Sequence, residues 1–293
     1  MNRLIKSEFR KIFSTNLWWA LLIPAGLFCF LLALLGGTVG NMFGTAVNTE
    51  IPESEMESIG SFTSLLTTLT FAAGLVAAGI FAGIFGALGM AGEARHKTIT
   101  TTFLVSDSRS SVLGAKVVSY AAIGALYGLV SVILGSLGAG IGASFTSFPD
   151  IGSWLLLSLV AVVVMSLWTI LGLGLGALIS NQAGVVLTLV LLVLIGEGLI
   201  AQLFAEMGVE NAADYLPGGS ASAALLGLAV TLGLQPFLDS VGVTIDQLSA
   251  EAPEMSMFTD MSDQWLISAL VFLLWTAIFV AAGWLANNKR DIT

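Results

Sequence analysis

Six apolar runs dominate the sequence, and each is long enough to cross a bilayer as a helix. About 20 apolar residues at 1.5 Å per residue span the ~30 Å hydrocarbon core. Only 10% of the residues are charged, whereas a soluble domain carries about 25%. Backbone in lipid must pair internally, and barrel strands would alternate over about 10 residues instead. We therefore predict an all-α membrane protein with six transmembrane helices, at 17–39, 62–90, 117–141, 154–179, 184–204 and 265–286.

The first 16 residues predict an amphipathic helix on the membrane surface. On a helix, Leu4, Ile5, Phe9, Ile12 and Phe13 gather on one side. The basic residues of this segment lie on the other side and define the interfacial helix: Arg3, Lys6, Arg10 and Lys11. Such a helix lies in the interface with its apolar face toward the acyl chains. The alternative is the charged start of a signal peptide, but no A-x-A-like cleavage site ends the next run.

The distribution of charge predicts the topology. All ten Lys and Arg residues lie in the N-terminal helix, in the loop 92–116 or in the tail after residue 286. An even number of spans puts these three segments on one side, and the positive-inside rule makes that side cytoplasmic. Four acids share it, namely Glu8, Glu93, Asp107 and Asp291, while fourteen lie on the other side. Both termini are thus predicted to be cytoplasmic.

The segment 205–263 is predicted to be extracellular and partly re-entrant. It has one break at Leu216–Ser220 and a second at Gln235-Pro236, with only about 15 apolar residues between them. That length is too short to span comfortably, so we expect this piece to dip into the membrane and cap the outer end of the bundle.

Small residues recur at four-residue spacing in the spans. Examples are Gly79, Gly83 and Ala87, then Gly124 and Gly128, Gly138 and Gly142, and Gly172 and Gly176. Small residues let helix backbones approach closely in lipid. Packing within one subunit is the first interpretation of these stripes, and a dimer face is the second.

Glu197 is the acid inside a predicted span, and an intramembrane acid is a functional candidate by default. With Gln202 it defines a possible intramembrane polar site. The alternatives are a helix break near the outer interface, or a proton or substrate site.

Several kinds of chemistry have no motif here. The sequence has no G-x-x-x-x-G-K-[ST] phosphate loop, no H-E-x-x-H and no G-x-S-x-G. One histidine and one cysteine cannot build a His/Cys metal cluster. We therefore expect the chain to have no catalytic residues and to bind no cofactor or metal. We also expect that it is not an enzyme.

The loop 92–116 is the candidate contact for another protein. Arg95, Lys97 and Arg109 could pair with acids of a soluble partner, and Ile99, Phe103 and Leu104 could fill a groove on it. Thr98 to Thr102 could start helical turns. The alternative is a solvated loop whose charges only set the topology.

These segments resemble the type-2 permease subunits of bacterial ATP-binding-cassette (ABC) exporters over nearly the whole chain. The basic N-terminal helix running into Trp18-Trp19 is similar to the family's connecting helix. Glu93-Ala94-Arg95-His96-Lys97-Thr98-Ile99 matches an E-x-R-x-x-T-I/L pattern after the second span. Ser108-Arg109 and Gly114-Ala115-Lys116 match family elements before the third span, and Leu216-Pro217 is similar to the outer re-entrant region.

The resemblance implies a permease in the bacterial plasma membrane. It would form a homodimer or heterodimer of permeases above two separate ATPase subunits, which bind ATP and Mg. The residues expected to contact the ATPase are Glu93, Arg95, His96, Lys97, Thr98, Ile99 and Phe103. Spans two and five would line a cavity for export of a hydrophobic or amphipathic drug, peptide or lipid. The alternatives are a proton-coupled secondary transporter using Glu197 and a non-transporting sensor or scaffold.

Overall fold

The computed structural model describes residues 2–47, 56–95, 109–145, 148–209, 212–244, 247 and 256–289. Within these ranges the chain is helical with no β-strand, which confirms the all-α prediction. The α-helices are α1 (Asn2–Phe13), α2 (Leu17–Val47), α3 (Met56–Arg95), α5 (Arg109–Gly142), α6 (Ile151–Leu178), α7 (Gln182–Leu191), α8 (Glu197–Glu206), α9 (Pro217–Val241) and α11 (Ser256–Lys289). A π-helical turn, η2 (Leu192–Gly196), joins α7 to α8, and a 3-10 turn, η3 (Ala212–Tyr215), precedes α9.

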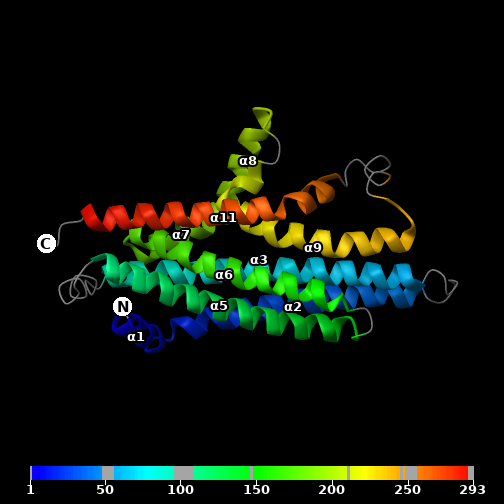
Figure 1. The fold of residues 1–293 in the computed structure, drawn as a ribbon, viewed down its shortest axis with the longest axis horizontal. Coiled ribbons are helices and arrows are strands. Elements are labelled where there is room, and N and C mark those ends of the chain that lie inside the picture. Colours follow the sequence, from blue (N-terminus) through cyan, green and yellow to red (C-terminus); the bar gives the residue numbers. More distant parts are fainter. Residues whose placement is uncertain are drawn as a thin grey trace.

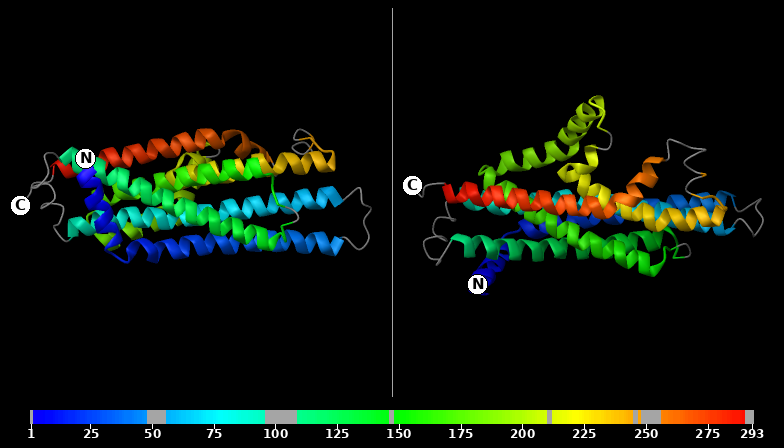
Figure 2. Two further views of the ribbon diagram at one scale, coloured as in Figure 1. Left: turned by 60° about the horizontal axis from the view of Figure 1, so that its bottom comes forward. Right: turned by 45° about the horizontal axis from the view of Figure 1, so that its top comes forward.

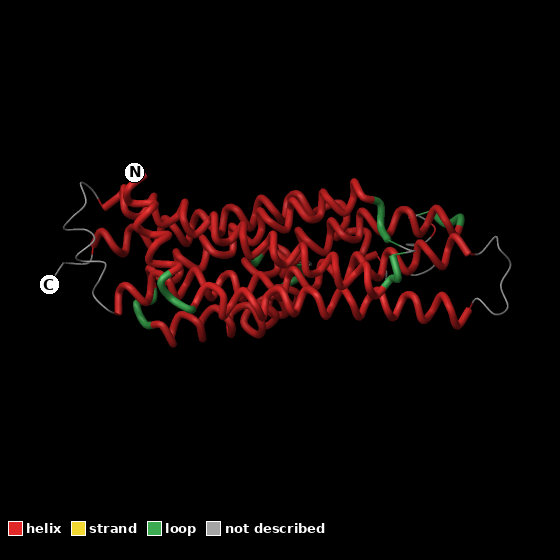
Figure 3. The backbone as a smooth tube through the Cα atoms, turned by 90° about the horizontal axis from the view of Figure 1, so that it is seen from below, coloured by secondary structure: helices red, strands yellow, loops and turns green. Residues whose placement is uncertain are grey.

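The long helices form one elongated bundle. Helices α2, α3, α5, α6 and α11 run along a common axis, and α1 lies at the same end as the C-terminal end of α11 (Figures 1 and 3). Helix α3 ends and α5 begins at this end as well, and α9 ends at the opposite one (Figure 1). We call the end that carries α1 the basic end, because it gathers α1 and the helix ends at 95, 109 and 289.

Within the described ranges, seven helices are long and apolar enough to cross a membrane, so the six-span count is not confirmed. The additional candidate is Pro217–Val241. Helix α9 begins at Pro217, where a missing N–H costs nothing. It continues through Pro236, so the predicted break at Gln235-Pro236 is wrong. Pro236 lies near the C-terminal end of the helix, and the buried Leu238 holds the last turn in place until Gly242 ends it at φ 69°.

Helix α9 is part of the bundle rather than a cap over its end. It packs along α3 and α11. In its most apolar stretch 61% of the residues are buried, as in α3, against 17% for the α7–α8 segment. The α7–α8 segment slants away from the bundle, and the chain returns to the bundle where α9 begins (Figure 2). The segment 182–241 therefore runs from the basic end to the opposite end in two parts. Helix α7 covers the first part of this path and α9 covers the second.

The glycine stripes bring helices of the same chain into contact. A Cβ at Gly172 or Gly176 of α6 would collide with the carbonyl oxygen of Gly83 or Ala87 of α3. The other two stripes also bring helix backbones together. A Cβ at Gly124 or Gly128 would collide with α6, and a Cβ at Gly138 or Gly142 would collide with α2. Packing within one subunit is therefore the correct interpretation of these residues.

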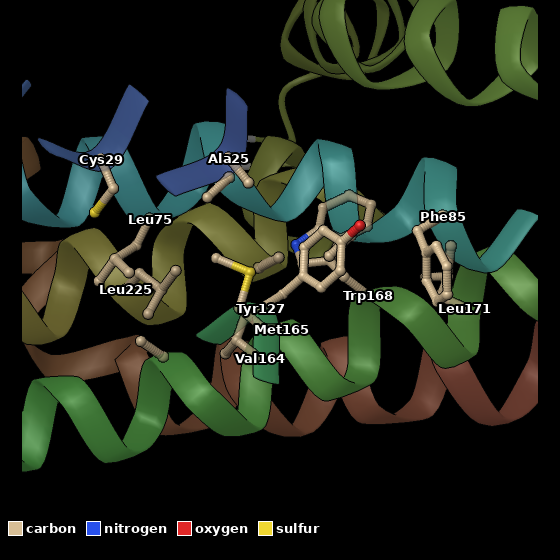
Figure 4. Packing of buried hydrophobic residues seen from close by; sticks show 14 of the residues in the cluster. Ala25, Cys29, Leu75, Phe85, Tyr127, Val164, Met165, Trp168, Leu171 and Leu225 are labelled. Atoms are coloured by element: carbon tan, nitrogen blue, oxygen red, sulfur yellow. The ribbon is translucent and has the colours of Figure 1, made fainter. Parts of the chain in front are cut away.

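Aromatic side chains fill the middle of the bundle. Tyr127 is fully buried, and its hydroxyl donates to the carbonyl oxygen of Trp18 at 2.7 Å. Phe85 stacks on Tyr127 with ring centroids 5.6 Å apart, and Phe71 of α3 stacks on Trp154 of α6 with ring centroids 4.2 Å apart. Phe85, Tyr127 and Trp168 are among the buried residues of this core (Figure 4). These contacts join α2, α3, α5 and α6 around one core, which fixes the geometry of the basic end.

A pair of alanine substitutions tests the α3–α6 crossing. We expect Gly172→Ala to lower the free energy of unfolding by about 1–3 kcal/mol, because the added methyl group meets backbone that cannot rotate away. Gly198→Ala is the matched control, since nothing lies within 4 Å of its Cβ position. Equal unfolding free energies for the two variants, measured in mixed micelles, would contradict the crossing described here.

Candidate functional site: a buried charge cluster at the basic end

Four charged side chains from three helices meet at the basic end. Glu8 and Lys11 come from α1, Glu93 from the last turn of α3, and Lys116 from the second turn of α5. The Lys116 Nζ lies 2.6 Å from Glu8 Oε2 and 2.6 Å from Glu93 Oε1. The Lys11 Nζ lies 2.8 Å from Glu8 Oε1 and 3.3 Å from the same Glu93 oxygen. Each lysine therefore bridges both carboxylates, and we call these four residues the charge cluster.

The cluster is buried on the side of α5. Lys116 is 0% exposed and Glu8 is 3% exposed, whereas the Lys11 side chain is 42% exposed. Charges out of water are tolerated only when they are paired and hydrogen-bonded. The cluster meets this condition by placing two lysines against two glutamates, so that its formal charge is zero.

Helix α1 docks on the bundle through one face. Glu8 and Ile12 are one turn apart and both buried, while Arg3, Lys6 and Arg10 are exposed. Residues at i, i+3 and i+7 share a helix face, so the last three form a basic stripe on the outer side of α1. The fourth predicted residue of the interfacial helix, Lys11, lies in the charge cluster instead of the stripe.

The cluster changes how its members on α1 titrate. Burial alone opposes ionisation of Glu8, but the Lys116 ammonium and hydrogen bonds from both lysines outweigh it, so the pKa of Glu8 lies below its ordinary value. Burial likewise opposes the charge on Lys11, but its contacts with Glu8 and Glu93 outweigh burial and raise the pKa of Lys11.

These shifts predict how pH acts on the docking of α1. Because its pKa is lowered, the Glu8 carboxylate stabilises the fold at pH values above its ordinary pKa of 4.5. This stabilisation is lost as the pH falls toward the lowered pKa. Because its pKa is raised, the Lys11 ammonium stabilises the fold at pH values below its ordinary pKa of 10.5. This stabilisation is lost as the pH rises toward the raised pKa. We expect thermal stability to fall below about pH 4.5, with a shallower acid limb in Glu8→Gln. Superimposable acid limbs would exclude a contribution from Glu8.

Arg95 lies beside the cluster and is more open. It is the last residue of α3, is exposed, and donates from Nη1 to Gln182 Oε1 at 3.1 Å. Gln182 opens α7, directly after Asn181, whose side chain accepts from the N–H groups of Ala183 and Gly184. The Arg95 contact thus connects the ends of α3 and α7. The other residues expected to contact the ATPase, His96, Lys97, Thr98, Ile99 and Phe103, lie outside the described residues.

Two members of the cluster were not predicted as site residues. Glu8 is the acid of the N-terminal helix, and it lies on the same face as Leu4 and Ile12 rather than among the cations. An acid on the apolar side of an amphipathic helix is a usable signal for a buried ion pair. The sequence presents Lys116 only as part of the Gly114-Ala115-Lys116 element before the third span. The structure places it in the interior, between Glu8 and Glu93.

Glu197 lies away from the charge cluster and has backbone partners. It is 6% exposed, and its two carboxylate oxygens accept the N–H groups of Gly218 and Gly219, each at 2.7 Å. Those N–H groups belong to the first turn of α9, which has no helical partners for them. Gln202 is exposed on α8, and no contact between its side chain and Glu197 is present in the described part of the chain. The structure therefore places the two proposed polar residues apart.

Comparison with known proteins identifies the family of this chain. A search of curated proteins finds no match. The profile of a family described as "ABC-2 family transporter protein" matches residues 3–292, which includes α1, the charge cluster and α11. Members of this family are membrane subunits of ABC transporters. Its match over nearly the whole chain, together with a bundle of long apolar helices, shows that the chain belongs to the ABC-2 family of multi-pass transporter permeases.

Proposed function

We propose that the chain is the membrane subunit of an ABC exporter and transmits motion from a separate ATPase to its helices. The charge cluster is the observation that carries this proposal. It joins α1 to α3 and α5, the two helices that flank the segment 96–108. A force applied to that segment would reach three helices together, because moving one of them alone would separate buried opposite charges.

The proposed topology has six crossings with the basic end in the cytoplasm. Helices α2, α3, α5, α6 and α11 would each cross once, and the segment 182–241 would supply the remaining crossing. The positive-inside rule supports this orientation, since all ten Lys and Arg residues belong to α1, to 92–116 or to the tail. Two ATPase subunits carrying ATP and Mg would bind below the basic end.

Arg95 is the residue through which we test contact with the ATPase. In the reconstituted complex we expect Arg95→Ala to reduce transport per ATP hydrolysed by about 10-fold, the loss of one hydrogen-bonded charge contact. Gln182→Ala is the matched control, because it removes the same internal hydrogen bond and keeps the cation. An equal loss in both variants would assign the effect to the α3–α7 contact, and unchanged coupling in Arg95→Ala would refute the ATPase contact.

A second permease is proposed to cover the α7–α8 segment. This segment is the least buried of the candidate spans, and its exposed residues include Leu194, Leu199 and Leu203. The polar Gln202 is exposed among them and Gly198 has open space at its Cβ. A polar side chain and a small residue on an apolar helix fit a helix interface better than lipid. We expect Gly198→Cys to cross-link between copies in membranes and Ile133→Cys, exposed on α5, to remain uncross-linked.

The proposed cargo is hydrophobic or amphipathic. One groove in the bundle supports this class of cargo, because it holds about 360 Å³ between α3, α5, α6 and α11 and its lining is apolar. Met90, Leu173 and Trp284 are among its lining residues. By resemblance to the family, the main cavity would form between two copies along α3 and the α7–α8 segment, and cargo would leave at the end opposite the charge cluster.

A further inference from the structure

Two segments between residues 182 and 241 are each long enough to cross a bilayer. Both 182–206 and 217–241 contain 25 residues, which corresponds to about 37 Å of helix against a hydrocarbon core of ~30 Å. The first segment starts at the basic end, where Gln182 contacts Arg95. The second runs within the bundle to the opposite end (Figure 1). The α7–α8 segment therefore has the length of a full crossing, although it follows the bundle for only part of that length.

The bend in the first segment lies at the π-helical turn η2. Beyond η2, α8 stands out from the side of the bundle, between its two ends (Figures 1 and 2). A π turn holds one more residue than an α turn, and such turns bend helices and are frequent at functional sites. Gly196 and Gly198 flank the first residue of α8, and no described residue of another helix lies within 4 Å of a Cβ added at either of them. Packing against other helices therefore does not fix the angle at this turn.

Glu197 fixes the position of the turn without fixing α8. Its carboxylate accepts the N–H groups of Gly218 and Gly219 at the start of α9, each at 2.7 Å. Val193 of η2 packs against the main hydrophobic core. Past Glu197, every residue of α8 is exposed or partly exposed, and the main contacts of α8 in the described chain are with η2 and η3. The turn is therefore a fixed point, and α8 is the part that can change direction.

The last residue of α8 is an acid, which makes the described direction of this helix costly in lipid. Leu199, Leu203 and Phe204 make α8 apolar, and Glu206 ends it at an exposed position. With the long axis of the bundle across the bilayer, whichever end is cytoplasmic, α8 stands at the depth of the hydrocarbon core, where an acid is costly. If α8 continued in line with α7, Glu206 would lie at the far end of a helix of about 37 Å, beyond the ~30 Å core.

We propose that Gly196-Glu197-Gly198 is a hinge on which α8 swings between the described position and a second position in line with α7. Lipid favours the in-line position, because this position brings Glu206 to the membrane surface. A cover over α8, such as the second permease proposed above, favours the described position, because it separates α8 from lipid. The connection 207–216 is long enough for both positions, since an extended chain of this length reaches about 33 Å and α8 is about 15 Å long.

The test measures distances between two spin labels by double electron–electron resonance in single full-length chains, first in detergent micelles and then in lipid nanodiscs. One label replaces Leu203 of α8 and the other replaces Leu270, which is exposed on α11, while the buried Cys29 is protected from labelling. We expect two distance populations. Their ratio should shift at least 10-fold toward the in-line position in nanodiscs, because a micelle has no hydrocarbon layer of fixed thickness to hold Glu206.

Labels at Leu187 and Leu270 give the control distance, because the exposed Leu187 lies on α7, before the hinge. This pair should show one population, with the same mean distance in micelles and in nanodiscs. A single unchanged population for Leu203 and Leu270 would overturn the hinge. A matching change in the control distance would also overturn it, because the motion would then include α7.

Two substitutions at Glu206 test the cause of the swing. Glu206→Leu removes the acid and should abolish the shift between micelles and nanodiscs, since an apolar end of α8 is stable in lipid. Glu206→Asp is the matched variant, because it keeps the charge, and it should shift as the unmodified chain does. An equal shift in Glu206→Leu and Glu206→Asp would overturn the role of lipid in moving α8.

Discussion

Replacing Lys116 with methionine should lower the free energy of unfolding by about 3–5 kcal/mol, which is the usual cost of removing one partner from a buried ion pair. Lys116 is fully buried and contacts both carboxylates at 2.6 Å. Methionine has a similar length, so the loss of charge outweighs the change in packing. The variant leaves Glu8 and Glu93 close together with Lys11 alone, and Lys11 is half-exposed. Equilibrium unfolding in mixed micelles measures the difference.

Two companion variants separate charge from other effects. Lys6→Met removes an exposed lysine of the basic stripe and should change stability by less than about 0.5 kcal/mol. Lys116→Met combined with Glu8→Gln should recover part of the loss, because one of the two buried carboxylates is then neutral. If Lys116→Met proves as stable as Lys6→Met, or if the second substitution adds to the loss, the charge cluster does not hold α1 in place.

The positions of the basic residues could be predicted well from the sequence. The charge pattern assigned α1, the segment 92–116 and the tail to one side, and the structure brings α1 and the facing ends of α3, α5 and α11 to one end of the bundle. This succeeds because charged residues are costly in lipid, so their positions in the chain mark where helices leave it. The glycine stripes were predictable for a related reason, since small residues permit close contact between helices.

The charge cluster could not be predicted in the same way. Glu8 and Lys116 are 108 residues apart, and their contact depends on the angle at which α1 crosses α5. No local pattern in the sequence determines that angle. In isolation each residue resembles an ordinary surface charge close to the end of an apolar run, and only the tertiary contact shows that Lys116 is buried.

Helix α9 departs from prediction because packing overrides local signals. Pro217, Gly218, Gly219 and Pro236 were taken to break the chain on both sides of a short apolar piece. Pro217 starts the helix instead, the two glycines allow Glu197 to reach their N–H groups, and Pro236 is accommodated within the last turns. The α3 and α11 surfaces bury one side of α9 along its length. Helix propensity in such a setting is a weak guide.

Glu197→Ala should destabilise the start of α9 by about 2–4 kcal/mol, because it removes the two hydrogen bonds that the Glu197 side chain accepts and leaves the buried Gly218 N–H and the half-buried Gly219 N–H without this acceptor. Gly218 and Gly219 suit this contact closely. A Cβ at Gly218 would lie 2.9 Å from Glu197 Oε2, and one at Gly219 would collide with the carbonyl oxygen of Ala213. Trp275 of α11 supports the same junction by donating to the Tyr215 carbonyl at 2.8 Å. Hydrogen exchange at Gly218 to Ala221 should therefore accelerate in Glu197→Ala.

The same substitution separates a structural role of Glu197 from a role in proton transfer. Glu206→Ala, on the exposed end of α8, is the control and should leave exchange at α9 unchanged. Glu197→Gln keeps one carbonyl oxygen and should retain part of the protection, whereas it mimics a protonated acid and would abolish proton-driven transport. The bidentate contact with the α9 N-terminus favours the structural role, because both carboxylate oxygens are already engaged by the N–H groups of Gly218 and Gly219. Normal exchange protection in Glu197→Gln together with complete loss of transport would reverse this assignment and make Glu197 a proton site.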